Sequence, residues 1–146
     1  MKVYVDADAC PVIDEAIIIC NKFSIKIVIV CDDSHMINRE VEIIVVEKGF
    51  DSSDYKILSL LCEGDLVITN DYGLSALVLA KKCSVINFDG KIILENEIDA
   101  MLASRAFNAK MRKANIRFKG PSKRSIEQNK VFKTKLESFL LKTTNN

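Results

Sequence analysis

Histidine and cysteine, the ligands of most zinc sites, are used sparingly in this sequence. It contains one histidine, His35, and five cysteines, none of which form a Cys-x-x-Cys pair. Because zinc sites need closely spaced His and Cys ligands, we expect no zinc centre. We interpret most of the cysteines as small buried residues of a reducing compartment. Cys10 keeps a second interpretation, since it precedes an expected helix start, where a helix dipole can activate a thiol.

Long hydrophobic runs are also absent from the sequence. The longest runs, among them residues 16–20 and 27–31, contain five residues, whereas a membrane span requires ~18 or more. The N-terminal segment carries Asp6 and Asp8 where a secretion signal needs apolar residues. We therefore expect a cytoplasmic protein that does not enter a membrane. With 146 residues, 49% of them hydrophobic and 28% charged, the chain has the size and composition of one globular domain.

Positive and negative charges are separated along the chain, although the formal net charge is only +1. Residues 1–104 contain nine basic and eighteen acidic side chains, a net charge of −9, whereas residues 105–146 contain twelve basic and two acidic ones, a net charge of +10. We describe the single expected domain as an acidic α/β body, residues 1–95, followed by a basic helical C-terminal segment, residues 96–142. Such a segment either binds phosphates or neutralises the acidic body, and charge alone favours neither.

Short apolar runs alternate with helical patterns along the chain. Strands are expected at residues 3–5, 25–30, 43–46, 66–69, 85–88 and 92–94. Helices are expected from Pro11, between Asp51 and Gly64, over residues 73–82 and 96–114, and from Ser125. Continuous β-branched runs are typical of strands that are buried on both faces, as in parallel sheets. This order predicts an α/β fold, a three-layer sandwich with a mostly parallel central sheet plus C-terminal helices.

Helix ends and one turn are predicted from short local signals. Three pairs have the spacing of an N-cap residue and its N3 partner: Asp51 with Asp54, Asn96 with Asp99, and Ser125 with Gln128. Gly64 is expected to end the second helix, and Asp89-Gly90 is expected to form a hairpin turn. Apolar residues of the last helix repeat at i, i+4, i+7 and i+8 from Phe132, which predicts that one helix face packs on the body.

Acidic side chains lie at three of the expected strand ends. Asp6 and Asp8 follow the first strand, Asp32 and Asp33 follow the second, and Asp71 follows the strand before the third helix. If the sheet order is 3-2-1-4-5, the first and fourth strands are neighbours, and Asp6, Asp8 and Asp71 converge at the ligand-binding edge. Grouped carboxylates without histidine suit Mg²⁺ or Mn²⁺, which can activate water and neutralise a phosphoryl group.

Aspartate is also a common cap and turn residue, so each acid has a structural interpretation. That interpretation is preferred for four of them: Asp51, Asp54, Asp65 and Asp89. Asp71 fits an N-cap and a metal ligand equally well. For Asp6 and Asp8 the functional interpretation is preferred, because a cation would relieve the repulsion within Asp-x-Asp. The roles of Asp32 and Asp33 stay open.

Several motifs resemble those of the YaiI/YqxD family of uncharacterised bacterial proteins. The most specific is the segment Val5-Asp6-Ala7-Asp8-Ala9-Cys10-Pro11-Val12. The supporting ones are Gly49-Phe50-Asp51 with Asp54, Gly64-Asp65-Leu66-Val67-Ile68-Thr69 with Asp71, Arg105, Arg112, Gly120-Pro121 and Phe132. The resemblance covers nearly the whole chain. That family is grouped with PIN-like proteins, many of which are Mg²⁺-dependent ribonucleases with acids at these strand ends.

The resemblance implies a PIN-like fold and a metal-dependent nuclease or phosphodiesterase that acts on RNA. Asp6, Asp8 and Asp71 would then be catalytic and would hold Mg²⁺ or Mn²⁺. The substrate-binding residues expected in that case are Thr69, Arg105, Arg112, Lys123 and Arg124. Gln128 stands where an acid is common, and Asp89 lies in a stretch that replaces Pro-Arg-Gly, so neither is expected as a ligand. The glutamate that PIN nucleases supply from a middle helix has no obvious counterpart.

Two other classes of function are compatible with the sequence. A haloacid dehalogenase-type phosphatase would use Asp6 as nucleophile, Asp8 as general acid and Thr69 as the phosphate-binding hydroxyl. It also needs an acid pair after a later strand, where only Asp89 is found, so we rank it lower. A non-catalytic module would bind RNA or a protein through the basic segment without chemistry. These patterns do not determine the oligomeric state.

Overall fold

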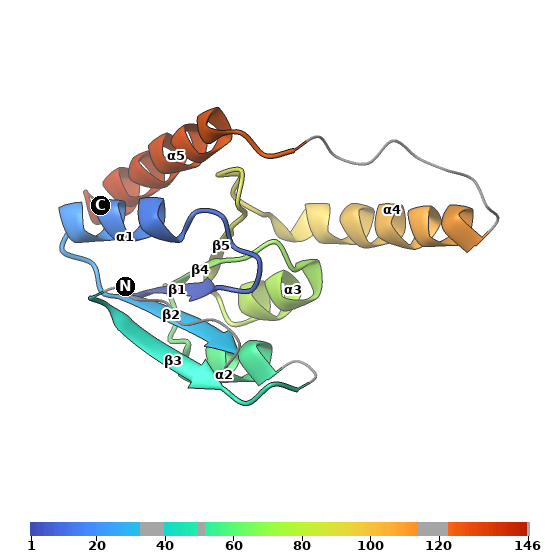
Figure 1. Ribbon diagram of the computed structural model, residues 1–146, viewed down its shortest axis with the longest axis horizontal. Coiled ribbons are helices and arrows are strands. Elements are labelled where there is room, and N and C mark those ends of the chain that lie inside the picture. The colour runs from blue at the N-terminus through green and yellow to red at the C-terminus, as the bar shows by residue number, and fades with distance from the viewer. Residues whose placement is uncertain (33–39, 50–51, 114–122, 146) are drawn as a thin grey trace.

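The computed structural model describes residues 1–32, 40–49, 52–113 and 123–145, which form a central sheet with helices on both faces (Figure 1). The strands are β1 (Val3–Asp6), β2 (Ile27–Asp32), β3 (Glu42–Val46), β4 (Leu66–Ile68) and β5 (Ser84–Ile86). The helices are α1 (Ile13–Lys22), α2 (Ser52–Leu60), α3 (Tyr72–Ala80), α4 (Glu95–Lys113) and α5 (Ile126–Thr144). Several sequence signals, namely Asp33, His35, Asp51 and Gly120-Pro121, fall outside these described residues.

The sheet has the order β3-β2-β1-β4-β5, and its paired strands run parallel. β1 lies at the centre, where Val3 pairs with Ile27 of β2 on one side and with Leu66 of β4 on the other. The β-branched run of β2 is buried because helices cover both faces of the sheet there. The run of β3 was expected to be buried as well, but β3 is an edge strand that is only partly covered, and its Val45 is 58% exposed. The predicted α/β three-layer sandwich is confirmed, and a PIN-like fold is compatible with this arrangement.

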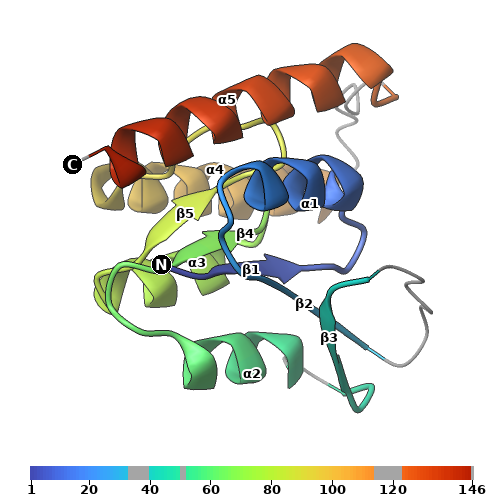
Figure 2. The same ribbon diagram turned by 90° about the vertical axis from the view of Figure 1, so that its left-hand side faces the viewer.

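Alternate residues of the central strand enter two separate hydrophobic cores. Val3 and Val5 belong to the core beneath α1 and α5, whereas Tyr4 belongs to the core shared by α2, α3 and the start of α4. Figure 2 shows α1 and α5 over one face of the sheet and α2 and α3 against the other. This alternation follows from the two-residue period of a strand, which sends neighbouring side chains to opposite faces.

Helix α5 closes the first of these cores. Its apolar stripe, predicted from the spacing after Phe132, places Phe132, Leu136 and Leu140 in fully buried positions in the core beneath α1 and α5. The predicted capping box is confirmed, because the Gln128 N–H donates to Ser125 Oγ at 3.3 Å and the Ser125 N–H donates to Gln128 Oε1 at 2.7 Å. The basic C-terminal segment is therefore anchored to the acidic body by apolar packing.

Three predicted helix boundaries are wrong, and for two of them a neighbouring turn sets the boundary. Helix α1 begins at Ile13 rather than at Pro11, after a turn in which the Cys10 N–H donates to the Ala7 carbonyl at 3.1 Å. Helix α2 ends at Leu60, before Gly64, because the Asp65 carboxylate accepts the Cys62 N–H at 2.9 Å and closes a turn. The third boundary concerns α4, which begins at Glu95, so that Asn96 lies in its first turn instead of capping it.

The predicted hairpin around Asp89-Gly90 is present in a reduced form. Ile86 and Ile92 form a single antiparallel bridge, and no second strand is assigned within residues 91–94. The Asn87 side chain accepts the N–H groups of Asp89 and Lys91 and thereby fixes the turn. Gly90 has a φ of +84°, and a Cβ atom there would lie 2.7 Å from the Lys135 Cβ of α5. Only glycine fits this contact between the turn and α5 without a shift of the chain.

Helix α4 differs from the other helices in how little of it is buried. Its 19 residues contain one buried side chain, Ile98, and Figure 1 shows the helix extending away from the rest of the molecule. Phe107, which is 55% exposed, lies on this projecting part. None of the helices in the described ranges is long and apolar enough to cross a membrane.

Candidate functional site

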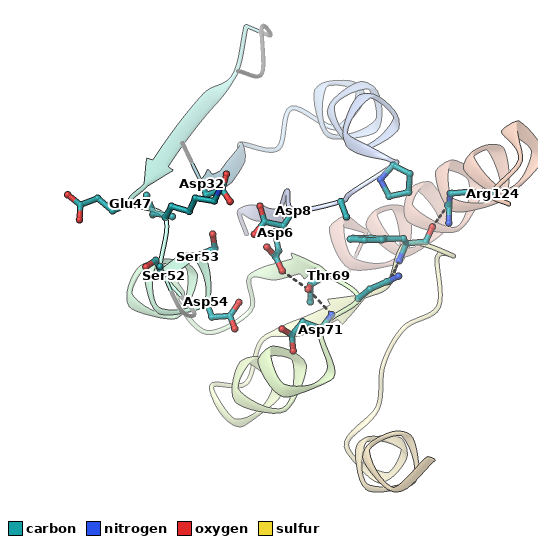
Figure 3. A pocket seen from close by; sticks show the side chains of 17 residues that line it. Asp6, Asp8, Asp32, Glu47, Ser52, Ser53, Asp54, Thr69, Asp71 and Arg124 are labelled. Carbon is teal, nitrogen blue, oxygen red and sulfur yellow. Dashed lines mark hydrogen bonds between the residues drawn. The ribbon is translucent and has the colours of Figure 1, made fainter. Parts of the chain in front are cut away.

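A cavity of about 570 Å³ opens at the carboxyl ends of the central strands (Figure 3). It lies beside β1 and β4, where the chain order of the sheet reverses, which is the ligand-binding position of doubly wound sheets. Six acidic side chains line it: Asp6, Asp8, Asp32, Glu47, Asp54 and Asp71. The expected convergence of Asp6, Asp8 and Asp71 at one edge of the sheet is therefore observed.

Thr69 connects two of these acids through hydrogen bonds. Its hydroxyl donates to Asp6 Oδ2 at 3.0 Å, and its oxygen accepts the backbone N–H of Asp71 at 3.0 Å. Asp71 Oδ1 in turn accepts the N–H of Leu74 at 3.1 Å and caps α3. Asp71 thus serves as the N-cap, which confirms its structural interpretation, and it also lines the cavity, so that its role as a metal ligand stays a prediction. Thr69, only 1% exposed, orients Asp6.

Asp6 is the carboxyl group most affected by this environment. Its pKa is raised from 3.8 to about 6, mainly by burial and further by the charges of Asp8 and Asp71, while the hydrogen bond from Thr69 opposes the change. The repulsion predicted from the Asp-x-Asp spacing is thus present in the fold. A cation in the cavity would remove this repulsion and favour the charged carboxylate.

Asp54 is a cavity acid to which the sequence analysis gave only a structural role. Its spacing from Asp51 suggested a helix cap, yet it lines the cavity from the first turn of α2. In Figure 3 its carboxyl group points into the same space as those of Asp6 and Asp71, whereas Glu47 points away from them. Asp32 lies at the far side of the cavity, at the end of β2. A middle helix thus provides a further cavity acid, but it is an aspartate, whereas the resemblance to PIN nucleases implied a glutamate.

The donor chemistry of the cavity suits a hard divalent cation. Oxygen ligands from several carboxylates are those preferred by Mg²⁺ and Mn²⁺. In the part of the chain that the structure describes, no three Asp, Glu, His or Cys side chains stand close enough together to form a complete metal site. Mg²⁺ is commonly held by one or two carboxylates together with water and substrate phosphates, so a complete protein cage is not required.

Arg124 lines the same cavity and is held in place by three hydrogen bonds. Its guanidinium donates to the Phe88 carbonyl at 2.5 Å, to Asp89 Oδ1 at 3.2 Å and to Asn129 Oδ1 at 2.6 Å. The Asn129 amide also donates to the Pro11 carbonyl at 3.2 Å. Arg124 therefore fixes the turn at Phe88 against the start of α5. Arg124 thus lines the cavity, and most of its guanidinium N–H groups already donate hydrogen bonds within the protein.

The other predicted basic residues do not reach this cavity. Lys123 is exposed beside Arg124 and is not part of the cavity wall. Arg105 and Arg112 lie on α4 and line a separate groove next to α3. The expected substrate-binding residues are thus divided between two places, with Thr69 and Arg124 at the cavity and the two α4 arginines at the groove.

Comparison with known proteins identifies the family. A family model described as "Uncharacterized BCR, YaiI/YqxD family" matches residues 4–142. The chain belongs to this family. A UPF0178 protein of Bacillus cereus strain Q1 is 40% identical over 146 residues, which cover 97% of this chain and all of the relative. A second, from Bacillus cereus strain AH187, is 41% identical over 144 residues, or 96% of this chain and 99% of the relative. No solved structure matches the chain.

The resemblance drawn from the sequence motifs is confirmed by this membership. A further relative, the UPF0178 protein of Bacillus thuringiensis subsp. konkukian strain 97-27, is 40% identical over 144 residues and covers 96% of this chain and 99% of its own. The segment matched by the YaiI/YqxD model contains the cavity acids and the arginines of α4. These names state no activity, so the function is argued from the site.

In this YaiI/YqxD protein, Cys10 is not an activated thiol. Burial raises its pKa to about 12, which leaves almost no thiolate at neutral pH. We expect iodoacetamide at pH 8 to modify the exposed Cys62 well before Cys10, with peptide mass spectrometry as the measurement. Equal labelling of the two cysteines in the folded protein would contradict this assignment.

Proposed function

We propose that this protein is a metal-dependent phosphodiesterase that cleaves RNA, with Asp6, Asp8 and Asp71 as the residues that hold Mg²⁺ or Mn²⁺. The observation that carries the proposal is their convergence on one cavity, where burial and mutual repulsion raise the pKa of Asp6 to about 6. Such a concentration of carboxylates is costly without a cation. Asp54 adds a fourth carboxylate to the same space.

A bound cation would supply a nucleophilic water and would neutralise charge on the phosphate. The chain's own residues have distinct parts in this proposal. Asp6 must lose its proton to bind the metal, and Thr69 keeps its carboxylate oriented through the 3.0 Å hydrogen bond. Metal affinity and cleavage should therefore fall below about pH 6, where protons compete for Asp6. In this proposal Arg124 of the cavity wall, and the exposed Lys123 next to it in the chain, would contact the RNA backbone.

Asp71→Asn provides the direct test of this proposal. We expect it to lower Mg²⁺- or Mn²⁺-dependent cleavage of labelled RNA by at least about 100-fold, because one anionic ligand is lost. Asparagine caps helices as well as aspartate does, so α3 should keep its start. Asp99→Asn, on the exposed surface of α4, is the matched control and should retain full activity. Cleavage is read on gels, and metal binding by calorimetry.

A second candidate function is a non-catalytic RNA-binding module. It is favoured by one observation, namely that the described residues hold no group of three metal ligands in place. Absence of cleavage of any RNA or DNA by the wild type, together with RNA binding that persists in a chelator, would support this alternative and overturn the proposal. A haloacid dehalogenase-type phosphatase would instead form an aspartyl phosphate on Asp6, detectable by mass spectrometry during turnover.

A further inference from the structure

A second hollow, of about 440 Å³, lies between the start of α3 and the inner face of α4. We call it the α3–α4 groove, and its main lining residues are Tyr72, Met101, Ser104, Arg105, Asn108 and Arg112. Its volume is in the range of small-ligand sites. The groove is separate from the acidic cavity, and the two share no lining residue.

The face of α4 that lines the groove has an unusual composition for a helix beside its own body. Residues at positions 101, 104, 105, 108 and 112 recur every three or four residues and therefore share one side of the helix. An inner face that serves stability is normally apolar. Here it carries two arginines, an asparagine and a serine, and only Ile98 of α4 is buried. This face suits the binding of a polar ligand better than packing.

The two arginines of the groove are available for such a ligand. Arg105 and Arg112 form no ion pair or hydrogen bond with the residues that the structure describes, in contrast to Arg124. They are seven positions apart on α4, which corresponds to about 10 Å along the helix axis. Two guanidinium groups at this spacing can hold two anionic groups of one extended ligand, such as neighbouring phosphates.

Tyr72 joins the groove to the acidic cavity. It follows Asp71 directly in the chain, and Asp71 lines the cavity while Tyr72 lines the groove. Its hydroxyl makes no hydrogen bond to any other described residue, so the ring is not fixed by a polar partner. An aromatic ring beside arginines is the combination with which proteins bind unpaired bases and their phosphates.

From this juxtaposition we propose that the α3–α4 groove binds one unpaired nucleotide of a single-stranded polynucleotide. The base stacks on Tyr72, and Arg105 and Arg112 hold the flanking phosphates. That the bound nucleic acid continues into the acidic cavity rests on the proposed phosphodiesterase function. Its binding in the groove does not. A base inside a duplex is already stacked on its neighbours, so the groove selects single strands over paired ones.

Fluorescence anisotropy with a short fluorescein-labelled oligouridylate, measured in a chelator, tests the groove without cleavage. Tyr72→Leu keeps the bulk of the side chain but removes the ring, and we expect it to weaken binding about tenfold. Tyr72→Phe should bind within about twofold of the wild type. Binding by Tyr72→Leu that equals the wild type, or binding of a fully paired hairpin as tight as that of the single strand, would overturn the proposal.

The arginines are tested by the salt dependence of the same measurement. Arg105→Gln and Arg112→Gln should each lower the slope of log Kd against log salt by about 0.7, the contribution of one phosphate contact on a single strand. Lys142→Gln removes the same charge from the exposed end of α5 and should leave the slope unchanged. Equal slopes for all three variants would contradict a role for the groove arginines.

Two further comparisons distinguish RNA from DNA as the ligand, and the groove proposal from the phosphodiesterase proposal. If oligothymidylate binds as tightly as oligouridylate, the groove contacts base and phosphate only. If oligouridylate binds more tightly, the groove also contacts the ribose. If binding depends on the Tyr72 ring but the wild type cleaves no nucleic acid, only the phosphodiesterase proposal is overturned. If the wild type cleaves RNA but binding does not depend on the Tyr72 ring, only the groove proposal is overturned.

Discussion

Asp6→Asn is expected to raise the free energy of unfolding by about 3 kcal/mol at pH 8, and by less than about 1 kcal/mol at pH 4. Burial raises the pKa of Asp6 to about 6 in the folded protein, against 3.8 for the ordinary side chain. Between these values the folded protein holds a proton that the unfolded chain has released. The wild type therefore loses stability as the pH rises through this interval, and the neutral amide does not.

Urea denaturation of wild type and Asp6→Asn at the two pH values measures this difference. The Thr69 hydroxyl can still donate to the amide oxygen of asparagine, so the local hydrogen bond is kept. Asp99→Asn is the control, because Asp99 is exposed on α4 and should change stability by less than about 0.5 kcal/mol at either pH. An equal gain for Asp6→Asn at pH 4 and pH 8 would show that the proton is not involved. A variant that is more stable but inactive is the usual result at a site built for function.

Phe132→Ala is expected to lower the free energy of unfolding by about 3 to 5 kcal/mol. Phe132 is 0% exposed and lies in the core that α5 shares with α1 and the sheet. The substitution removes a large apolar side chain and leaves a cavity that the surrounding elements can fill only in part. The midpoint of urea denaturation, followed by circular dichroism, measures the loss.

The matched control for this prediction is Phe107→Ala. Phe107 is 55% exposed on α4, so the same substitution there should cost less than about 0.5 kcal/mol. If Phe132→Ala is too unstable to purify, Phe132→Leu retains most of the volume and should show an intermediate loss. A loss below about 1 kcal/mol for Phe132→Ala would mean that α5 is not part of the cooperative core.

The sheet could be predicted from the sequence because its signals are local and strong. The β-branched runs of β2 and β3 and the Asp-x-Asp after β1 each follow from a few adjacent residues. The order β3-β2-β1-β4-β5 was one topology in which Asp6 and Asp71 would meet, and it is the one observed. The boundaries of α1 and α2 were missed because hydrogen bonds in the adjoining turns, such as that of Asp65 with Cys62, override helix signals.

The rest of the candidate site depends on contacts that sequence spacing does not encode. Asp54 has the spacing of a cap residue, and only the position of α2 beside β1 brings it to the cavity. Arg124 belongs to the basic segment, but two of its three partners are a carboxylate and a carbonyl 35 and 36 positions earlier in the chain. The separation of Arg105 and Arg112 from the cavity likewise results from where α4 leaves the body. One signal was available for these arginines, namely their shared helical face with Asn108.

The packing of α5 on α1 joins opposite ends of the chain, with consequences for synthesis of the protein. The cavity acids all lie within the first 71 residues, yet the core beneath α1 is completed only by Phe132, Leu136 and Leu140. A growing chain on the ribosome therefore has its full set of strands while one apolar face still lacks its cover, and such intermediates are prone to aggregate. A chain terminated before α5 would keep every carboxylate of the cavity and would nevertheless be a substrate for chaperones and proteases.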